Sequence, residues 1–258
     1  MRRLKAPVLL LATATSALLL LVSACGDKST GSSSPTTVDR RSATQLAADK
    51  AGAETAILKL SDLPPGWTAQ PSSPDSERSA EQRSAEAEFA ECADVDPSVI
   101  GAGSSSVTRA KSEEFSDDGD HQVEGSVTVI ATREAAKAQL SSIRKKEIPG
   151  CLANFVNRAI KSAIKNPKAG ESAPTGVEFG DAKVETLNLP GLHATSVGYR
   201  TIVPVRAEGR SVEVNLDIVL ALSKRSGISM TFTSFGPPFD SAVEVELTNK
   251  VIDRAPPD

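Results

Sequence analysis

The C-terminal third of the chain carries the pattern that most constrains its fold. Aliphatic residues occupy every second position from Val212 to Leu222, and Glu213, Asn215 and Asp217 lie between them. A strict period of two is typical of a β-strand with one buried face. The intervening turns are of hairpin length, which predicts antiparallel neighbours. We therefore expect four consecutive strands, over residues 177–189, 194–206, 211–222 and 228–235.

The upstream sequence adds a hairpin and several helices. Residues 107–115 and 122–131 read as two strands around an acidic turn, and Trp67 is expected to begin a short strand with its indole in the core or, alternatively, stacked on a ligand. Ser42, Thr132 and Asp240 are expected to cap helices. We expect these helices over 43–60, over a solvated segment 77–90, from 132 to an interruption at Pro149 and Gly150, over a strongly amphipathic 152–164, and after 240. The predicted fold class is α+β, a single domain with helices packed on a twisted antiparallel sheet.

The N-terminus carries the signature of export. Basic residues at positions 2, 3 and 5 precede about fifteen apolar or small residues, and the run ends in Leu21-Val22-Ser23-Ala24-Cys25. This stretch resembles the bacterial lipobox, in which cleavage before Cys25 follows attachment of a diacylglyceryl group to its sulfur. A plain cleaved signal or an uncleaved anchor are the alternatives, although the apolar run is short for a spanning helix, which needs about 20 residues.

The lipobox divides the chain into three parts. Residues 1–24 form the signal peptide, and residues 25–41 form the lipidated cysteine and a tether rich in Ser, Gly, Thr and Pro. Residues 42–258 form the single extracytoplasmic domain. We therefore predict a cell-membrane location, lipid-anchored on the extracytoplasmic face.

The charge of the chain restricts its partners. Removal of residues 1–24 changes the net charge from −4 to −7, because that segment holds three basic residues and no acidic residue. Without a compensating basic patch, such a chain is a poor candidate for nucleic acid or for an anionic membrane surface. The predicted partners are the membrane, through the lipid anchor, and an unidentified small molecule or envelope protein.

Cys92 and Cys151 remain once Cys25 is assigned to lipid. An even pair of cysteines in an oxidising compartment predicts a disulfide. Two free thiols are one alternative, and a metal site that also uses His121 and His193 is another.

Motifs for catalysis are missing from the sequence. It lacks the G-x-S-x-G, H-E-x-x-H and C-x-x-C motifs and the glycine-rich phosphate loops. Asp117, Asp118, Asp120 and His121 concentrate ligands that a weakly bound cation could use, although a solvated turn is the simpler explanation for them. We therefore predict no catalytic residues, no cofactor and no dedicated metal site.

The polar side of the C-terminal strands is the candidate ligand site. It carries Arg200, Arg206, Asn215 and Asp217, which would line a groove if no helix covers them; an ordinary hydrated sheet face is the alternative. In this hypothesis Arg200 and Arg206 recognise an anionic group.

Several segments together resemble a known group of proteins. They are the sequence LKLSDLPPGWT at 58–68, Cys92, the strand EGSVTV at 124–129, and Cys151. In this order they look like actinobacterial lipoproteins similar to the extracytoplasmic sensor domain of a mycobacterial serine/threonine kinase. The resemblance implies a non-enzymatic domain with a helix-backed antiparallel sheet and a ligand groove. Those sensor domains usually hold two disulfides whereas this chain can form one, so no ligand residue is carried over.

The expected function is that of a membrane-anchored lipoprotein with a non-enzymatic, sensor-like binding domain. The alternative is a carrier of lipid or glycolipid, which would need an apolar cavity between the 152–164 helix and the 212–222 strand.

Overall fold

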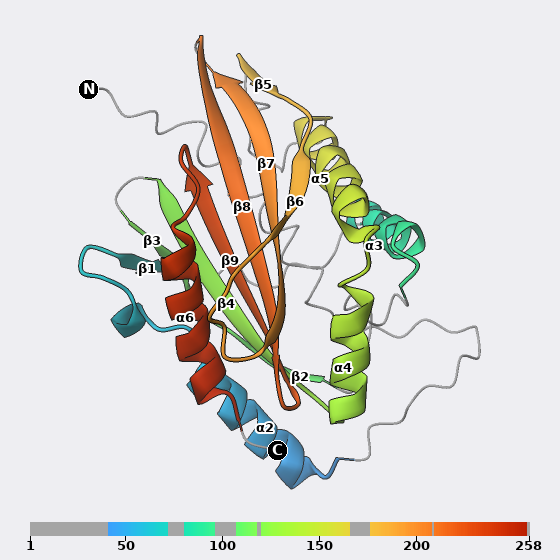
Figure 1. The fold of residues 1–258 in the computed structure, drawn as a ribbon, viewed down its shortest axis with the longest axis vertical. Coiled ribbons are helices and arrows are strands. Elements are labelled where there is room, and N and C mark those ends of the chain that lie inside the picture. Colours follow the sequence, from blue (N-terminus) through green and yellow to red (C-terminus); the bar gives the residue numbers. More distant parts are fainter. Residues whose placement is uncertain are drawn as a thin grey trace.

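The computed structural model describes residues 41–71, 80–95, 107–117, 120–165, 176–207 and 209–256. Its centre is one antiparallel sheet of nine strands, in the order β1-β3-β4-β9-β8-β7-β5, with β2 added to β4 and β6 added to β7 (Figure 1). The strands are β1 Thr68–Gln70, β2 Val107–Lys111, β3 Glu114–Ser116, β4 His121–Ile130, β5 Val177–Phe179, β6 Lys183–Leu187, β7 Thr195–Ala207, β8 Arg210–Ser223 and β9 Ser226–Phe235. The α+β prediction is confirmed.

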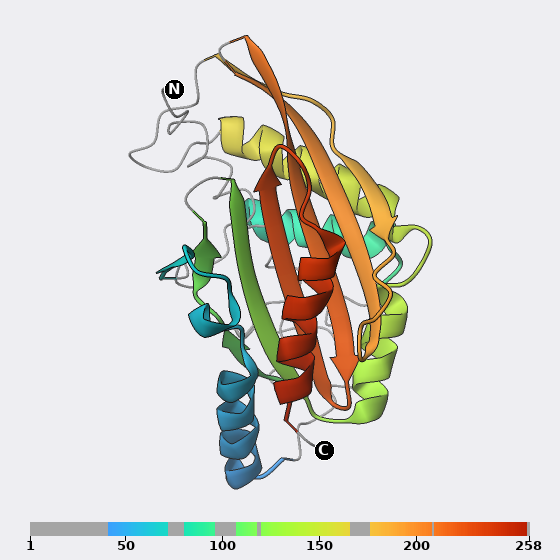
Figure 2. The ribbon, with the colours of Figure 1, turned by 60° about the vertical axis from the view of Figure 1, so that its left-hand side comes forward.

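Helices cover both faces of the sheet. The α-helices are α2 Ala43–Ala56, α3 Ala80–Cys92, α4 Arg133–Ser142, α5 Ile148–Lys165 and α6 Ser241–Arg254, and a 3-10 turn, η2, spans Leu60–Asp62. α2 and α6 lie on one face, which we call the first face, and α3, α4 and α5 lie on the second face (Figure 2). Within the described ranges, no helix is long and apolar enough to cross a membrane.

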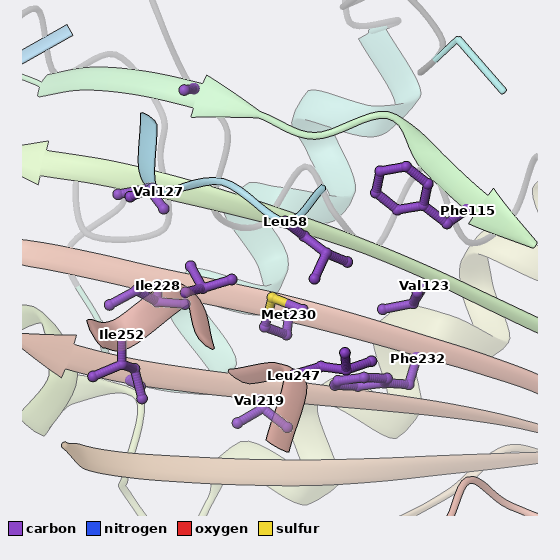
Figure 3. Packing of buried hydrophobic residues seen from close by; sticks show 14 of the residues in the cluster. Leu58, Phe115, Val123, Val127, Val219, Ile228, Met230, Phe232, Leu247 and Ile252 are labelled. Carbon is purple, nitrogen blue, oxygen red and sulfur yellow. The ribbon is translucent and has the colours of Figure 1, made fainter. Parts of the chain in front are cut away.

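The first face is an apolar core. Val123 and Val127 of β4 and Ile228, Met230 and Phe232 of β9 are at most 1% exposed and pack beneath α2 and α6 (Figure 3). A glycine in β4 makes room for this packing, because a Cβ at residue 125 would lie 2.7 Å from the Met230 sulfur. The core is therefore closed by close contact of β4 and β9 side chains.

The second face has its own core over β7 and β8. Leu152 and Phe155 of α5 are buried in one cluster with Val214, Leu216 and Ile218 of β8. The predicted amphipathic helix thus packs on the sheet, and the protein's own side chains fill this interface. α3 is held to α5 by a disulfide between Cys92 and Cys151, with an S–S distance of 2.03 Å. The disulfide prediction is confirmed, and a bonded pair cannot serve as two free thiols or as two metal-binding thiolates.

The predicted helix caps are present. The side chains of Ser42, Thr132 and Asp240 accept hydrogen bonds from backbone N–H groups in the first turns of α2, α4 and α6. Because these bonds satisfy donors that have no partner within the helix, short polar residues fix where each helix begins.

Two long strands of the prediction are each divided. The 177–189 strand breaks into β5 and β6 because the Ala182 N–H donates to Asn157 Oδ1 of α5, at 2.8 Å, and so leaves the ladder. The 107–115 strand breaks into β2 and β3 at Ser112, whose hydroxyl accepts from the Gly125 N–H at 2.9 Å. Side chains outside the strands supply these competing partners, so strand periodicity alone did not reveal the breaks.

Helix boundaries also differ from the prediction. α2 ends at Ala56 rather than at residue 60, because Asp62 accepts from the Lys59 N–H and pairs with Arg254, which holds the chain in the separate turn η2. α5 begins at Ile148 and includes Pro149 and Gly150. Proline is tolerated there because N–H groups in a first turn have no helical acceptor. α3 is described from residue 80, so residues 77–79 of its prediction lie outside the described ranges.

Candidate binding site

The second face changes character between β8 and β9. Over β7 and β8 it is apolar and carries the α5 core, whereas over β4 and β9 its side chains are polar. We call five of these polar residues the hydroxyl stripe. They are all between 2% and 7% exposed, and they comprise Ser126, Thr128, Ser229, Thr231 and Thr233.

Strand alternation and register bring the hydroxyl stripe together. Apolar residues at odd positions of β4 and at even positions of β9 point into the first core, so the residues between them point to the second face. Ser126 lies opposite Ser229, with Glu124 opposite Thr231 in the next row. Since neighbouring strands are roughly 4.8 Å apart and alternate residues roughly 7 Å apart, the hydroxyls form a regular grid.

Charged residues border the hydroxyl stripe. Lys111 of β2 pairs with Glu124 of β4 at 2.9 Å between Nζ and Oε2. Arg109 of β2 donates from Nη2 to the Ser126 hydroxyl at 3.2 Å. Burial raises the pKa of Glu114 above its ordinary value, and the neighbouring Glu124 adds to this effect while Lys111 opposes it. The opposite charges of Lys111 and Glu124 neutralise each other, and the centre of the grid consists of uncharged hydroxyl groups.

Burying these polar side chains lowers the stability of the folded chain. A buried hydroxyl without a hydrogen-bond partner costs roughly 1–3 kcal/mol, and Thr128 Oγ1 has no such partner in the described part of the chain. A buried ion pair such as Lys111–Glu124 is also often no more stabilising than apolar residues of similar size. Aliphatic side chains of similar size would avoid these costs. The polar groups are, however, able to form hydrogen bonds to a ligand.

The predicted ligand residues occupy a different place. Arg200, Asn215 and Asp217 lie on the first face, near the start of α6, where Asn215 and Asp217 are 2% and 1% exposed. Arg200 binds Asp217 through two hydrogen bonds of 2.8 and 2.6 Å. Asn215 donates to the Gly236 carbonyl at 2.7 Å. The hypothesis required that no helix cover these residues, but α6 does, and their polar atoms are already bound to one another or to the backbone.

Glu244 of α6 completes this buried group. It is 0% exposed, 3.6 Å from the Arg200 guanidinium, and neither carboxyl oxygen has a hydrogen-bond partner within the described ranges. Burial, together with the adjacent Asp217 carboxylate, raises the pKa of Glu244 to about 9. One guanidinium thus faces two carboxyl groups, and Glu244 holds a proton at neutral pH. This residue carried no signal in the sequence, because its helix shows an ordinary polar position there.

The other predicted sites are separated from one another. Arg206 is exposed near the end of β7, so it does not join Arg200, and ligand binding by the four residues stays a prediction. In the acidic turn, Asp117 accepts from His121 Nδ1 at 2.7 Å, and Asp118 lies outside the described residues. Cys25 also lies outside them. No group of three or more potential metal ligands occurs in the part of the chain that the structure describes.

Trp67 belongs to the first core. It lies just before β1, partly buried, with its ring centroid 6.4 Å from that of Phe239. This position agrees with the prediction that the indole turns inward, and stacking on a ligand stays an untested alternative.

Comparison with known proteins gives a distant likeness in fold. No family model and no curated protein matches the chain. Among solved structures, the extracellular domain of PknH from Mycobacterium tuberculosis is similar at 14% identity, with 80% of this chain and 95% of that chain covered and a TM-score of 0.36. An uncharacterised Mycobacterium smegmatis protein, the Rv0999 ortholog, is similar at 12% identity, with 76% and 92% covered and a TM-score of 0.33. The comparisons indicate no enzyme family.

Proposed function

We propose that this chain is a non-enzymatic binding domain, anchored by lipid on the extracytoplasmic face of the cell membrane, that holds a polar small molecule on the hydroxyl stripe. Cys25 is the acylated residue, and residues 26–41 are the tether. An envelope protein then distinguishes the ligand-bound domain from the ligand-free domain. Two or more acyl chains are needed for stable anchoring, because each buried methylene contributes about 0.8 kcal/mol.

The hydroxyl stripe is the observation that carries this proposal. Five buried hydroxyls on two adjacent strands, bordered by the Lys111–Glu124 ion pair and the Arg109 guanidinium, offer many hydrogen bonds. Such a surface suits a ligand rich in hydroxyl or amide groups. The apolar interface between α5 and β8 is filled by Phe155, Leu216 and their neighbours, which favours polar binding over carriage of an acyl chain.

Native mass spectrometry of the full chain, purified from a bacterial host, tests the site. We expect a polar small molecule to co-purify with the wild type and to be lost from the Ser229→Ala, Thr231→Val double variant. A matched control, Ser211→Ala with Thr186→Val, changes the same residue types at exposed positions and should retain the molecule. A co-purified lipid that both variants retain would instead support the lipid carrier. Loss of the polar molecule from both variants alike would show that it does not bind at the stripe.

The anchor has its own test. The N-terminal peptide of the membrane-extracted chain should begin at Cys25 and carry the mass of its acyl chains. Cys25→Ala should move the protein out of the membrane fraction without changing its thermal unfolding. An unmodified Cys25, or a variant that stays membrane-bound, would contradict the anchoring.

A further inference from the structure

The end of the tether is fixed to one end of the sheet. Arg41 pairs with Asp49 of α2 at 2.7 Å, and Arg225 of the β8–β9 turn pairs with the same carboxylate at 3.0 Å. Although burial acts to raise it, the hydrogen bonds from Arg225 and Arg41 hold the pKa of Asp49 below its ordinary value. Arg225 also donates to the Ile130 carbonyl at 3.0 Å, which joins this ion-pair group to the end of β4. The chain therefore leaves the domain at a defined position.

Basic side chains gather at this same end. α4 begins three residues after Ile130, with exposed Arg133 and Lys137 one helical turn apart, and Lys224 is exposed in the β8–β9 turn. Both ribbon views place the starts of α2 and α4 and the β8–β9 turn at one end of the molecule (Figures 1 and 2). We call the exposed Arg133, Lys137 and Lys224 the basic pole; the Arg41 and Arg225 side chains beside it are only 7% and 13% exposed and bind Asp49. Asp49 and Glu134 are the acidic residues of the same segments, so positive charge dominates locally although the chain from Cys25 onward has a net charge of −7.

We propose that the basic pole docks on a membrane surface that contains anionic lipid and thereby sets the orientation of the domain. This inference depends on the lipid anchor of the proposed function. Chains of about 16 residues with Ser- and Gly-rich composition span roughly 20–25 Å. A tether of this length would hold the pole close to the headgroups and give a weak attraction a high effective concentration. Each basic side chain near an anionic surface contributes roughly a fivefold increase in association.

Docking in this way fixes which part of the molecule faces outward. The β7–β8 hairpin lies at the opposite end of the sheet from the β8–β9 turn, so it points away from the membrane. The strands then stand steeply on the membrane, and both faces of the sheet, with the helices that cover them, are turned sideways.

Energy transfer to labelled lipid tests the orientation. The full acylated chain is reconstituted into phosphatidylcholine vesicles with or without 30% phosphatidylglycerol, with a dye on Thr44→Cys near the pole or on Ser211→Cys at the far end. Both native downstream cysteines are in the disulfide, so the new thiol is labelled selectively. We expect transfer from the residue 44 dye to rise at least twofold with phosphatidylglycerol at low salt and to fall back in high salt, while the residue 211 dye changes little.

Charge reversal provides the matched variants. Arg133→Glu, Lys137→Glu and Lys224→Glu together should abolish the rise, whereas Arg206→Glu with Arg210→Glu at the far end should leave it intact. Equal transfer from the residue 44 dye in both vesicle types, with the chain acylated and vesicle-bound, would overturn the docking but not the anchor. A chain that is not acylated or does not remain on either vesicle would overturn the proposed function itself.

Discussion

The two faces of β4 and β9 are built from the same strands and are both buried, but they differ in chemistry. On the first face Val127, Met230 and Phe232 fill the core, whereas on the second face Ser229 and Thr231 present hydroxyls. Burial of apolar surface explains the first face, since it contributes about 25 cal/mol per Å². It does not explain the second, and the proposed ligand site is our explanation for that difference.

Phe232→Ala should have the largest effect, because it removes a fully buried ring that packs 5.2 Å from the Phe239 ring. We expect a loss of about 3–5 kcal/mol in the free energy of unfolding, measured by urea denaturation. Thr233 follows Phe232 in β9 and points to the opposite face. Thr233→Val should change the same free energy by less than about 1 kcal/mol. Similar losses from both substitutions would mean that the two faces contribute equally to folding.

The disulfide should contribute almost as much, on the second face. Cys92→Ala with Cys151→Ala opens a link between residues 59 apart in the sequence, for which the chain-entropy model gives about 4 kcal/mol. Dithiothreitol should lower the melting temperature of the wild type and leave that of the double variant unchanged. An unaltered wild-type melting temperature would show that the apolar contacts of α5 alone hold this helix layer.

Glu244 tests the polar group on the first face through pH. Its pKa is about 9 in the folded chain, against an ordinary value of 4.5, so folding takes up a proton between these values. The stabilisation is complete below pH 4.5 and is lost as the pH rises towards 9. At pH 7 the free energy of unfolding is therefore lower than below pH 4.5, by on the order of 3 kcal/mol. The reason is that Glu244 is ionised in the unfolded chain at pH 7 but still protonated in the folded chain.

Glu244→Gln imitates the protonated acid, so it should remove this pH dependence and raise the melting temperature at pH 8. Thermal unfolding between pH 5 and pH 9 checks the slope. A variant with the same slope as the wild type would show that Glu244 does not titrate in this range.

The smallest stability effects are expected on the hydroxyl stripe. Thr231→Val keeps the shape of the side chain and removes one buried hydroxyl, so the free energy of unfolding of the ligand-free chain should stay within about 1 kcal/mol of the wild type or increase. Urea denaturation of ligand-free protein measures it. A loss above about 2 kcal/mol would show that Thr231 serves the folded structure, and the contrast between the two faces would then disappear.

The sequence predicted the elements better than the site. Caps such as Ser42 and the alternation from Val212 to Leu222 are local patterns, so they identified the helices and strands directly. The breaks at Ser112 and Ala182 depend on partners far along the chain. The stripe was visible as Ser, Thr and Thr at 229, 231 and 233, but alternation alone predicts a solvated face; only the register with β4 and the observed burial reveal the grid.

A crystal structure of the chain purified from a bacterial host would test the central claim most directly. We expect a bound polar molecule within hydrogen-bond distance of Ser229 and Thr231, on the second face over β4 and β9. A stripe covered only by the protein's own side chains, with every hydroxyl satisfied internally, would contradict it.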